Sequence, residues 1–229
     1  MAYSCVATSV AGFIQQLAVA YVAHGYYFYV TGRIPDEKDP MATDQKIMAQ
    51  YGIDTSKWTR ARRKKAGLAN VHYLRYGRFF VIIANHGEQP FFEAEANLLR
   101  DIRLSPIHFM GYSIGCHQER GGGVFHASVR ISQEVYRELK GKFERGAVHR
   151  AVEDLSRDMQ ATPYEPYAPV RDQLRCILRA VNRRRKAAGL EQLSQETLWE
   201  RRMPVKPFGE PTSQKVDARA RHSGKKTKL

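Results

Sequence analysis

The sequence predicts an α+β fold of about five mostly antiparallel strands with packed helices, a C-terminal helical lobe and a basic flexible tail. Runs of aromatic and β-branched residues predict the strands, and apolar residues at three- and four-residue spacing predict the helices. The chain has 229 residues, of which 43% are hydrophobic. That length is sufficient for one substantial core.

The predicted strands are short and separated by glycines. Residues 26–33 are rich in tyrosine and β-branched side chains and predict one strand. Residues 71–84 are broken at Gly77, so they predict a hairpin, and its second half is apolar throughout, as in a strand covered on both faces. Residues 107–114 predict a further strand. Three glycines at 121–123 then provide the positive φ that a hairpin turn needs.

The strand at 124–131 has the clearest alternation in the chain. Its odd-numbered residues, from Phe125 to Ile131, are apolar and predict a packed face. Its even-numbered residues, His126, Ser128 and Arg130, predict an open polar face. Such a face can contact nucleic acid, so His126 and Arg130 are candidate binding residues. Aromatic residues on the strands can also stack on unpaired bases, although most are expected in the core.

Helical spacing of apolar residues occurs over 10–21, 135–159 and 170–181. Shorter helices are expected at 41–51, 57–65 and 91–100. Gly141 and Gly146 are expected to bend or split the long helix that Ser132 caps. The two consecutive short helices before residue 66 also leave a helix-turn-helix arrangement open.

Proline spacing divides the chain. Residues 1–162 are expected to form the α+β body. Prolines 163, 166 and 169 make a stiff connector, and residues 163–203 form a basic helical lobe behind it. Residues 204–229 have low hydrophobicity and many lysines, so this tail is expected to be disordered when free.

Positive charge is gathered into three blocks. Residues 57–78 carry a net +8, residues 171–188 carry +6 and residues 201–229 carry +7. The blocks together carry +21 against a chain total of +14, so the rest of the chain carries −7. Basic blocks on a mildly acidic body are typical of nucleic-acid-binding proteins. Solubility charge and attraction to an acidic membrane surface are the plainer alternatives.

The first block predicts a phosphate-binding helix on a rigid hairpin. Its cations repel one another at i,i+4 spacing and include no acid, so a polyanion beside them would relieve the repulsion. The candidate phosphate-binding residues here are Lys57, Arg60, Arg62, Arg63, Lys64, Lys65, Arg75 and Arg78.

The helix at 169–188 predicts a second phosphate-binding element. Four of its arginines recur at i,i+4 spacing, each step being about 6 Å along the helix axis. The candidates are Arg171, Arg175, Arg179 and Arg183, extended by Arg184, Arg185 and Lys186. Cations at a helix C-terminus also complement the macrodipole, and Asp172 can neutralise part of the row.

A catalytic alternative rests on the glycine hairpin. His117 and His126 flank its turn, so pairing would bring the two imidazoles within reach, and Tyr112 is nearby in sequence. Two such groups can serve as acid and base in metal-independent RNA cleavage. The plainer interpretation makes both histidines surface residues.

Acids near residue 90 offer a metal-dependent alternative. They are Glu88, Glu93, Glu95 and Asp101, with His86 beside them. Carboxylates this close can hold Mg²⁺ for a nuclease, although acids at a helix N-terminus explain Glu93 and Glu95 more simply. Only this alternative requires a cofactor; otherwise we expect none, because the sequence contains no HxH, HExxH, Walker or dinucleotide motif.

The cysteines and the N-terminus favour a cytoplasmic protein. Cys5, Cys116 and Cys176 are far apart and form no CxxC pair, so neither a disulfide framework nor a structural zinc site is expected. The apolar run 5–23 contains polar residues and no basic leader, which argues against a signal peptide and a membrane partner.

We therefore expect a binding module rather than an enzyme: an RNA-binding component of a ribonucleoprotein, with RNA favoured over DNA. The first alternative is a nuclease or strand-transfer enzyme of a mobile or defence element. The second is an adaptor whose basic blocks meet acidic proteins or a membrane surface.

Overall fold

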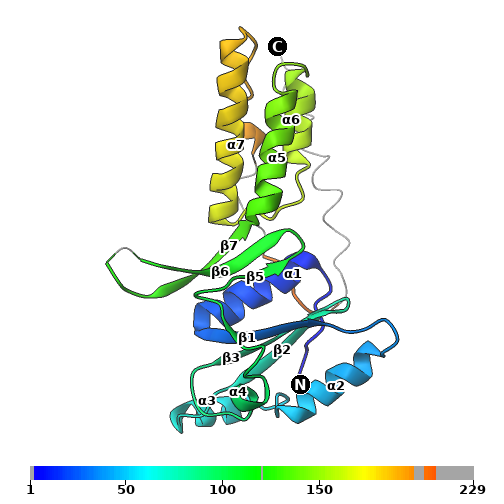
Figure 1. Ribbon diagram of the computed structural model, residues 1–229, viewed down its shortest axis with the longest axis vertical. Coiled ribbons are helices and arrows are strands. Elements are labelled where there is room, and N and C mark those ends of the chain that lie inside the picture. Colours follow the sequence, from blue (N-terminus) through cyan, green and yellow to red (C-terminus); the bar gives the residue numbers. More distant parts are fainter. Residues whose placement is uncertain (1–2, 120, 199–203, 210–229) are drawn as a thin grey trace, which may run out of the picture.

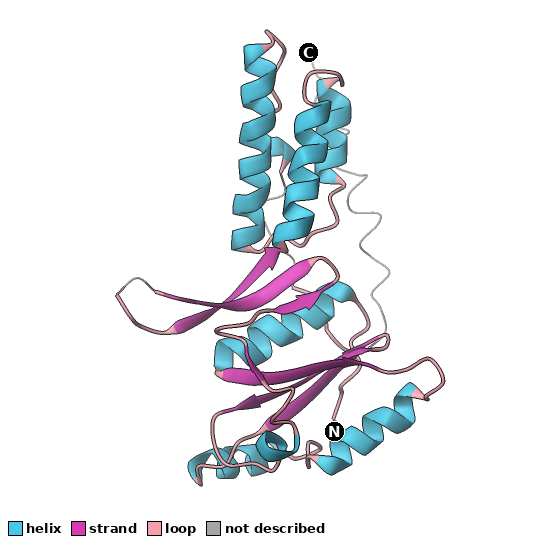
Figure 2. Cartoon of the chain, viewed as in Figure 1, coloured by secondary structure: helices cyan, strands magenta, loops and turns pink. Residues whose placement is uncertain are grey.

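The computed structural model describes residues 3–119, 121–198 and 204–209. Along its longest axis the molecule stacks a helical bundle, a three-stranded sheet, the N-terminal helix, a four-stranded sheet and a layer of short helices (Figures 1 and 2). Both sheets are antiparallel, so the predicted α+β class is confirmed. The strands number seven among the described residues, in two sheets, where the sequence predicts about five. Within this part of the chain, no helix is both long and apolar enough to cross a bilayer.

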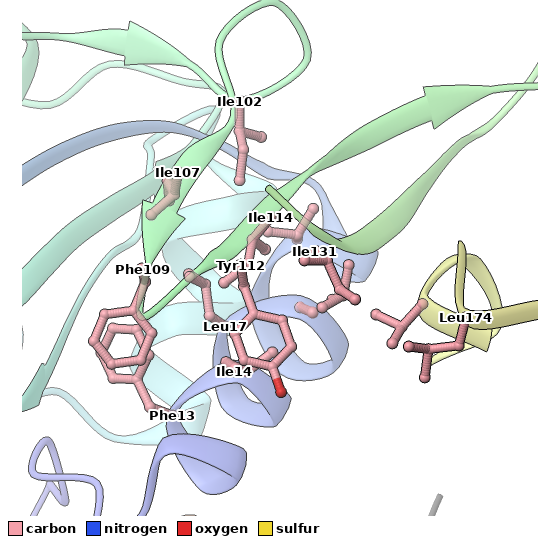
Figure 3. Packing of buried hydrophobic residues seen from close by; sticks show 14 of the residues in the cluster. Phe13, Ile14, Leu17, Ile102, Ile107, Phe109, Tyr112, Ile114, Ile131 and Leu174 are labelled. Atoms are coloured by element: carbon pink, nitrogen blue, oxygen red, sulfur yellow. The ribbon is translucent and has the colours of Figure 1, made fainter. Parts of the chain in front are cut away.

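The N-terminal helix lies between the two sheets and forms the centre of the core. It begins as α1 (Val10–Gln15), continues as the π-helical η1 (Gln16–Tyr21) and ends in the 3₁₀ turn η2 (Val22–His24). Ser9 caps its first turn, because its hydroxyl accepts a hydrogen bond from the Gly12 N–H. The fully buried side chains of Phe13, Ile14 and Leu17 contact strand residues of the three-stranded sheet (Figure 3).

The four-stranded sheet has the order β2-β3-β1-β4. Its strands are β1 (Tyr26–Arg33), β2 (Val71–Tyr76), β3 (Phe79–Asn85) and the two-residue β4 (Arg100–Asp101). The predicted hairpin turns at Gly77, whose φ is +57°. Strand β3 is apolar because both faces are covered: Val81 and Ile83 pack toward α1, and Ile82 and Ala84 pack toward the short helices.

Three short helices cover the far face of this sheet: α2 (Pro40–Gln50), α3 (Lys57–Lys65) and α4 (Phe91–Ala94). The helix predicted at 91–100 is therefore wrong beyond its first turn. Arg100 and Asp101 pair with Tyr29 and Phe28 of β1, and this strand pairing draws the chain away from a helical path.

The three-stranded sheet consists of β5 (Ile107–Phe109), β6 (Tyr112–Gln118) and β7 (Phe125–Ile131). The single strand predicted at 107–114 is wrong, because the chain reverses at Met110 and Gly111, which have φ values of +47° and +78°. Positive φ at both central residues suits a tight hairpin turn. The glycine hairpin between β6 and β7 is confirmed, and it projects from the body (Figure 1).

The C-terminal bundle contains α5 (Gln133–Gly146), α6 (Val152–Gln160) and α7 (Ala168–Ala187), followed by the 3₁₀ turn η3 (Gln195–Thr197). The long predicted helix splits after Gly146, as expected. The Gln173 side chain joins α7 to β7 by hydrogen bonds to both backbone groups of Ile131, at 2.8 and 2.9 Å. Helices α5 and α6 pack with α7, and the connector at 163–169 runs from α6 into the first turn of α7. The division into domains stays a prediction, and residues 210–229 of the predicted tail lie outside the described part.

Candidate nucleic-acid interface

Helix α3 is a surface helix fixed to the hairpin behind it. It begins at Lys57, because the Ser56 hydroxyl accepts the Thr59 N–H at 3.1 Å, and none of its residues is buried. The chain then turns at Gly67, with φ of +75°, into β2. The Asn70 amide donates to the Arg60 carbonyl at 3.0 Å, which ties the middle of the helix to the start of β2.

Within the described residues, the α3 cations lack acidic partners. In residues 3–119, 121–198 and 204–209, no salt bridge joins any of them to an acid. The only hydrogen bond from one of their side chains in that part goes from Arg60 to the Thr55 carbonyl. The six residues concerned are Lys57, Arg60, Arg62, Arg63, Lys64 and Lys65. Helix α3 therefore presents a concentrated positive field to solvent.

Arg75 does not belong to this interface, and its prediction as a phosphate-binding residue is wrong. It is 7% exposed and forms a two-pronged ion pair with Asp44 of α2, with Nε–Oδ1 and Nη2–Oδ2 distances of 2.7 Å. The Tyr73 hydroxyl donates to the same carboxylate at 2.6 Å. Strand alternation directs Tyr73 and Arg75 toward α2 rather than toward solvent.

Arg78 is partly exposed but is engaged by the loop before α2. Its guanidinium donates to the Pro35, Asp36 and Lys38 carbonyls and pairs with the Asp36 carboxylate at 3.1 Å. These contacts indicate that Arg78 shapes the loop and leaves less of its donor capacity for a ligand.

A buried histidine lies behind α3. The His72 ring stacks on Tyr21 with a centroid distance of 4.5 Å, and its Nδ1 is 3.1 Å from the Tyr3 hydroxyl. The same hydroxyl lies 2.9 Å from the Tyr73 carbonyl and accepts the Tyr73 N–H at 3.0 Å, so it joins the His72 ring to the β2 backbone. Burial and, to a smaller extent, the positive charge of Arg60 lower the pKa of His72 from 6.5 to about 4.

The predicted arginine row follows α7 at the opposite end of the molecule from α3 (Figure 1). Arg171, Arg175 and Arg179 line one wall of a groove of about 280 Å³ whose other walls include Leu174 and Leu198. Arg175 lies 3.6 Å from Asp172, and the Arg184 guanidinium donates to the Glu144 carbonyl at 3.3 Å. The two basic helices therefore form separate surfaces.

Arg185 is a structural residue, so its prediction as a phosphate-binding residue is also wrong. It is 4% exposed, and its Nη1 donates to the Ala147 and Arg150 carbonyls at 2.8 and 2.9 Å. Its Nε donates to the Glu191 carbonyl. The sequence contains a signal for this role: residue 185 lies four positions after the buried Val181, on the apolar stripe of the helix.

The outward face of the three-stranded sheet is polar, as predicted, and contains one further histidine. His126 and Arg130 are exposed, whereas Ser128 is 6% exposed and accepts from Arg130 Nε at 3.3 Å. Register places His108 opposite Ser113, which in turn is opposite Arg130, so all three share this face. The alternation of His108 with buried Ile107 and Phe109 is the signal that sequence reasoning missed.

The structure brings His117 and His126 together but leaves Tyr112 elsewhere. The two histidines are cross-strand partners with ring centroids 5.6 Å apart, and His126 Nε2 lies 2.8 Å from Glu119 Oε1. Tyr112 is buried opposite Ile131, and burial raises its pKa above its ordinary value. Its hydroxyl accepts the Glu165 N–H, so its prediction as a catalytic residue with the histidines is wrong.

The acids between residues 88 and 101 do not gather into a metal site. The Tyr51 hydroxyl donates to Glu95, and Asp101 pairs with Arg103 at 2.6 Å. The backbone of Glu88 forms hydrogen bonds with Gly67 and Ala69 at the start of β2. Across the described residues, no group of three or more histidines, cysteines or acids is placed to hold a metal ion.

One aromatic residue of the surface was not singled out from the sequence. Trp58, in the first turn of α3, is 80% exposed.

Comparisons of this chain with protein-family models, curated proteins and solved structures found no match.

Proposed function

We propose that this protein binds nucleic acid and that α3 is its principal phosphate-binding element. The observation that supports the proposal is the six-cation helix with no buried residue and, within the described chain, no acidic partner. Exposed like charges at i,i+4 spacing are destabilising by themselves, and phosphates on the outside of the helix would relieve that repulsion. The hairpin beneath α3 supplies a rigid support.

We propose that the ligand is RNA rather than duplex DNA, and that the protein is a component of a ribonucleoprotein. The exposed cations of α7 form a second surface at the other end of the molecule, and the three-stranded sheet, to which the exposed His126 and Arg130 belong, lies between the two helices. Separated surfaces suit a folded, irregular polyanion better than one linear groove. The basic segment after residue 204 adds positive charge that can order on RNA.

Purification without nuclease tests the proposal. We expect a high 260/280 absorbance ratio, RNA that can be sequenced, and affinity that falls steeply between about 50 and 200 mM salt, because phosphate contacts release counterions. An adaptor for acidic proteins would instead carry no nucleic acid. Absence of bound RNA, together with RNA affinity that is indifferent to salt, would contradict the proposal.

A second candidate function, metal-independent RNA cleavage, is favoured by the pairing of His117 with His126 beside Glu119. In this reaction one imidazole removes the proton of a ribose 2′-hydroxyl as its oxygen attacks phosphorus. The other imidazole, protonated at the start, gives its proton to the leaving 5′-oxygen. The O2′–P bond forms and the P–O5′ bond breaks, leaving a 2′,3′-cyclic phosphate and a 5′-hydroxyl.

Cleavage of end-labelled RNA in EDTA tests this candidate. The wild type should cut RNA but not the all-deoxy strand, and His117→Ala and His126→Ala should each abolish cutting while RNA affinity stays within a few fold. An unchanged rate for His126→Ala would remove the pair from consideration.

A further inference from the structure

Helix α3 presents its one aromatic ring to solvent. Trp58 is 80% exposed, whereas tryptophan is among the residues that bury most surface when they pack. None of the aromatic contacts among the described residues involves its ring. Leaving such a ring in water is unfavourable, so the ring is available to a partner.

Helical spacing surrounds this ring with positive charge. Arg62 lies four residues after Trp58 and Lys65 lies seven after it, so the three side chains share one face of α3. Lys57 precedes the ring and Ala61, between the cations, is small and leaves the face unobstructed. A flat aromatic surface is therefore followed on the same face by two cations, about 6 and 10.5 Å further along the helix axis.

We propose that Trp58 stacks on an unpaired base of single-stranded RNA while Arg62 and Lys65 hold the next phosphates along the strand. This inference rests on the proposed function and adds the substrate class. Single-stranded sites combine a cationic track with an aromatic platform, because every base has a face on which a ring can stack. In a regular duplex the bases are already stacked and offer Trp58 no such face.

The composition of α3 argues against a membrane surface and against a protein groove as the partner of this helix. A helix that lies in a membrane interface needs an apolar face, and a helix that docks into a protein groove needs anchors at i, i+3 or i+4 and i+7. Trp58 is the only large apolar residue of α3, and its i+4 and i+7 neighbours are Arg62 and Lys65. Charge complementarity therefore selects a polyanion.

Fluorescence tests the stacking directly. The sequence contains two tryptophans, so the full-length Trp199→Phe variant leaves Trp58 as the only tryptophan. We expect oligouridylate to quench its emission, and heparin, a polyanion without bases, to bind without comparable quenching. An RNA duplex of the same length should quench much less than the single strand.

Substitution gives the matching affinity test. Base–aromatic stacking contributes about 1–3 kcal/mol per base, so Trp58→Ala should weaken oligouridylate binding by about 5- to 150-fold and leave heparin binding unchanged. Trp58→Phe should recover part of the loss. The residue is on the surface, so both variants should unfold at nearly the same urea concentration as the wild type.

The outcomes separate the two proposals. Salt-dependent oligouridylate binding that Trp58→Ala does not weaken, or that leaves Trp58 emission unquenched, overturns the stacking and leaves the proposed function standing. A blue shift of Trp58 emission with phosphatidylserine vesicles, without quenching by RNA, overturns it in favour of a membrane surface. Failure to bind any RNA overturns both.

Discussion

Helices α3 and α7 are both rich in arginine and lysine, but the fold uses them differently. Helix α3 buries no residue, and the structure shows no acid paired with its cations in the described chain. Helix α7 buries an apolar stripe against the rest of the bundle and places one of its arginines inside the protein. Positive charge therefore has two roles here: buried cations hold the fold together, and exposed cations are available to a ligand.

Position relative to apolar neighbours distinguishes the two roles better than charge does. Arg185 continues the stripe of Leu174, Leu178 and Val181, and it is buried. The cations of α3 have no such stripe beside them. The comparison leads to predictions in which removing a buried partner costs stability and removing an exposed cation costs affinity.

The largest expected loss of stability follows from Asp44→Ala. It leaves the buried guanidinium of Arg75 without its carboxylate and removes the acceptor of the Tyr73 hydroxyl, which should lower the free energy of unfolding by about 3–5 kcal/mol in a urea titration. The matched control is Asp36→Ala, which removes the exposed partner of Arg78 and should cost less than about 1 kcal/mol. Equal losses in the two variants would contradict the distinction between buried and exposed pairs.

The next effect comes from His72, whose pKa is about 4 in the folded protein against an ordinary value of 6.5. Between pH 6.5 and about 4, His72 is protonated in the unfolded chain but neutral in the folded protein, so stability should fall as pH decreases through this range. Over this window the loss of unfolding free energy should be roughly 3 kcal/mol. His72→Gln should flatten the unfolding free energy measured over that window.

The same window sharpens the comparison, because Arg60 is the α3 cation whose charge reaches the interior. Arg60→Gln should raise the pKa of His72 part of the way toward 6.5 and narrow the window in which stability is lost. The tyrosines that face His72 are Tyr3, Tyr21 and Tyr26; their pKa values are raised, so they stay neutral throughout. If the unfolding free energy depended on pH in the same way in Arg60→Gln and the wild type, the charge of Arg60 would have no effect on the buried His72.

A smaller loss of stability is expected for Arg185→Met. The substitution keeps the aliphatic bulk but removes the donor from the Ala147, Arg150 and Glu191 carbonyls, which should cost about 1–3 kcal/mol in thermal or urea unfolding. Arg183→Met, on the exposed side of the same helix, should change stability by less than about 0.5 kcal/mol. A neutral Arg185→Met would show that the buried guanidinium is not needed for the bundle.

Much of the local structure could be predicted because the spacing of apolar residues indicates which side of a helix or strand is buried. The stripe of Phe13, Ile14 and Leu17 predicts the central helix, and the alternation from Phe125 to Ile131 predicts one packed and one polar face. The reversal at Met110 could not be predicted, because methionine at positive φ is not a turn signal. The early end of the 91–100 helix depends on strand pairing with β1, which is a tertiary effect.

The candidate site divides in the same way. Exposure of α3 follows from the sequence, because a nine-residue segment with one large apolar residue has nothing to bury. The inward direction of Arg75 does not follow from the sequence. Every residue of β2 from Val71 to Arg75 is buried, so this strand has no alternation of buried and exposed residues that would show which face is open. Its partner Asp44 is distant in sequence, and only the packing of α2 against the sheet brings the two together.

A matched pair of charge variants tests the central claim most directly. One variant replaces Arg62, Arg63, Lys64 and Lys65 of α3 with glutamine, and the other replaces Arg179, Arg183, Arg184 and Lys186 of α7, so both lose four positive charges. Single-stranded RNA affinity is measured against salt concentration. The account predicts that the α3 variant reduces the slope of log affinity against log salt by about 3 and the α7 variant reduces it less. An unchanged slope in the α3 variant, or equal reductions in both, would contradict it.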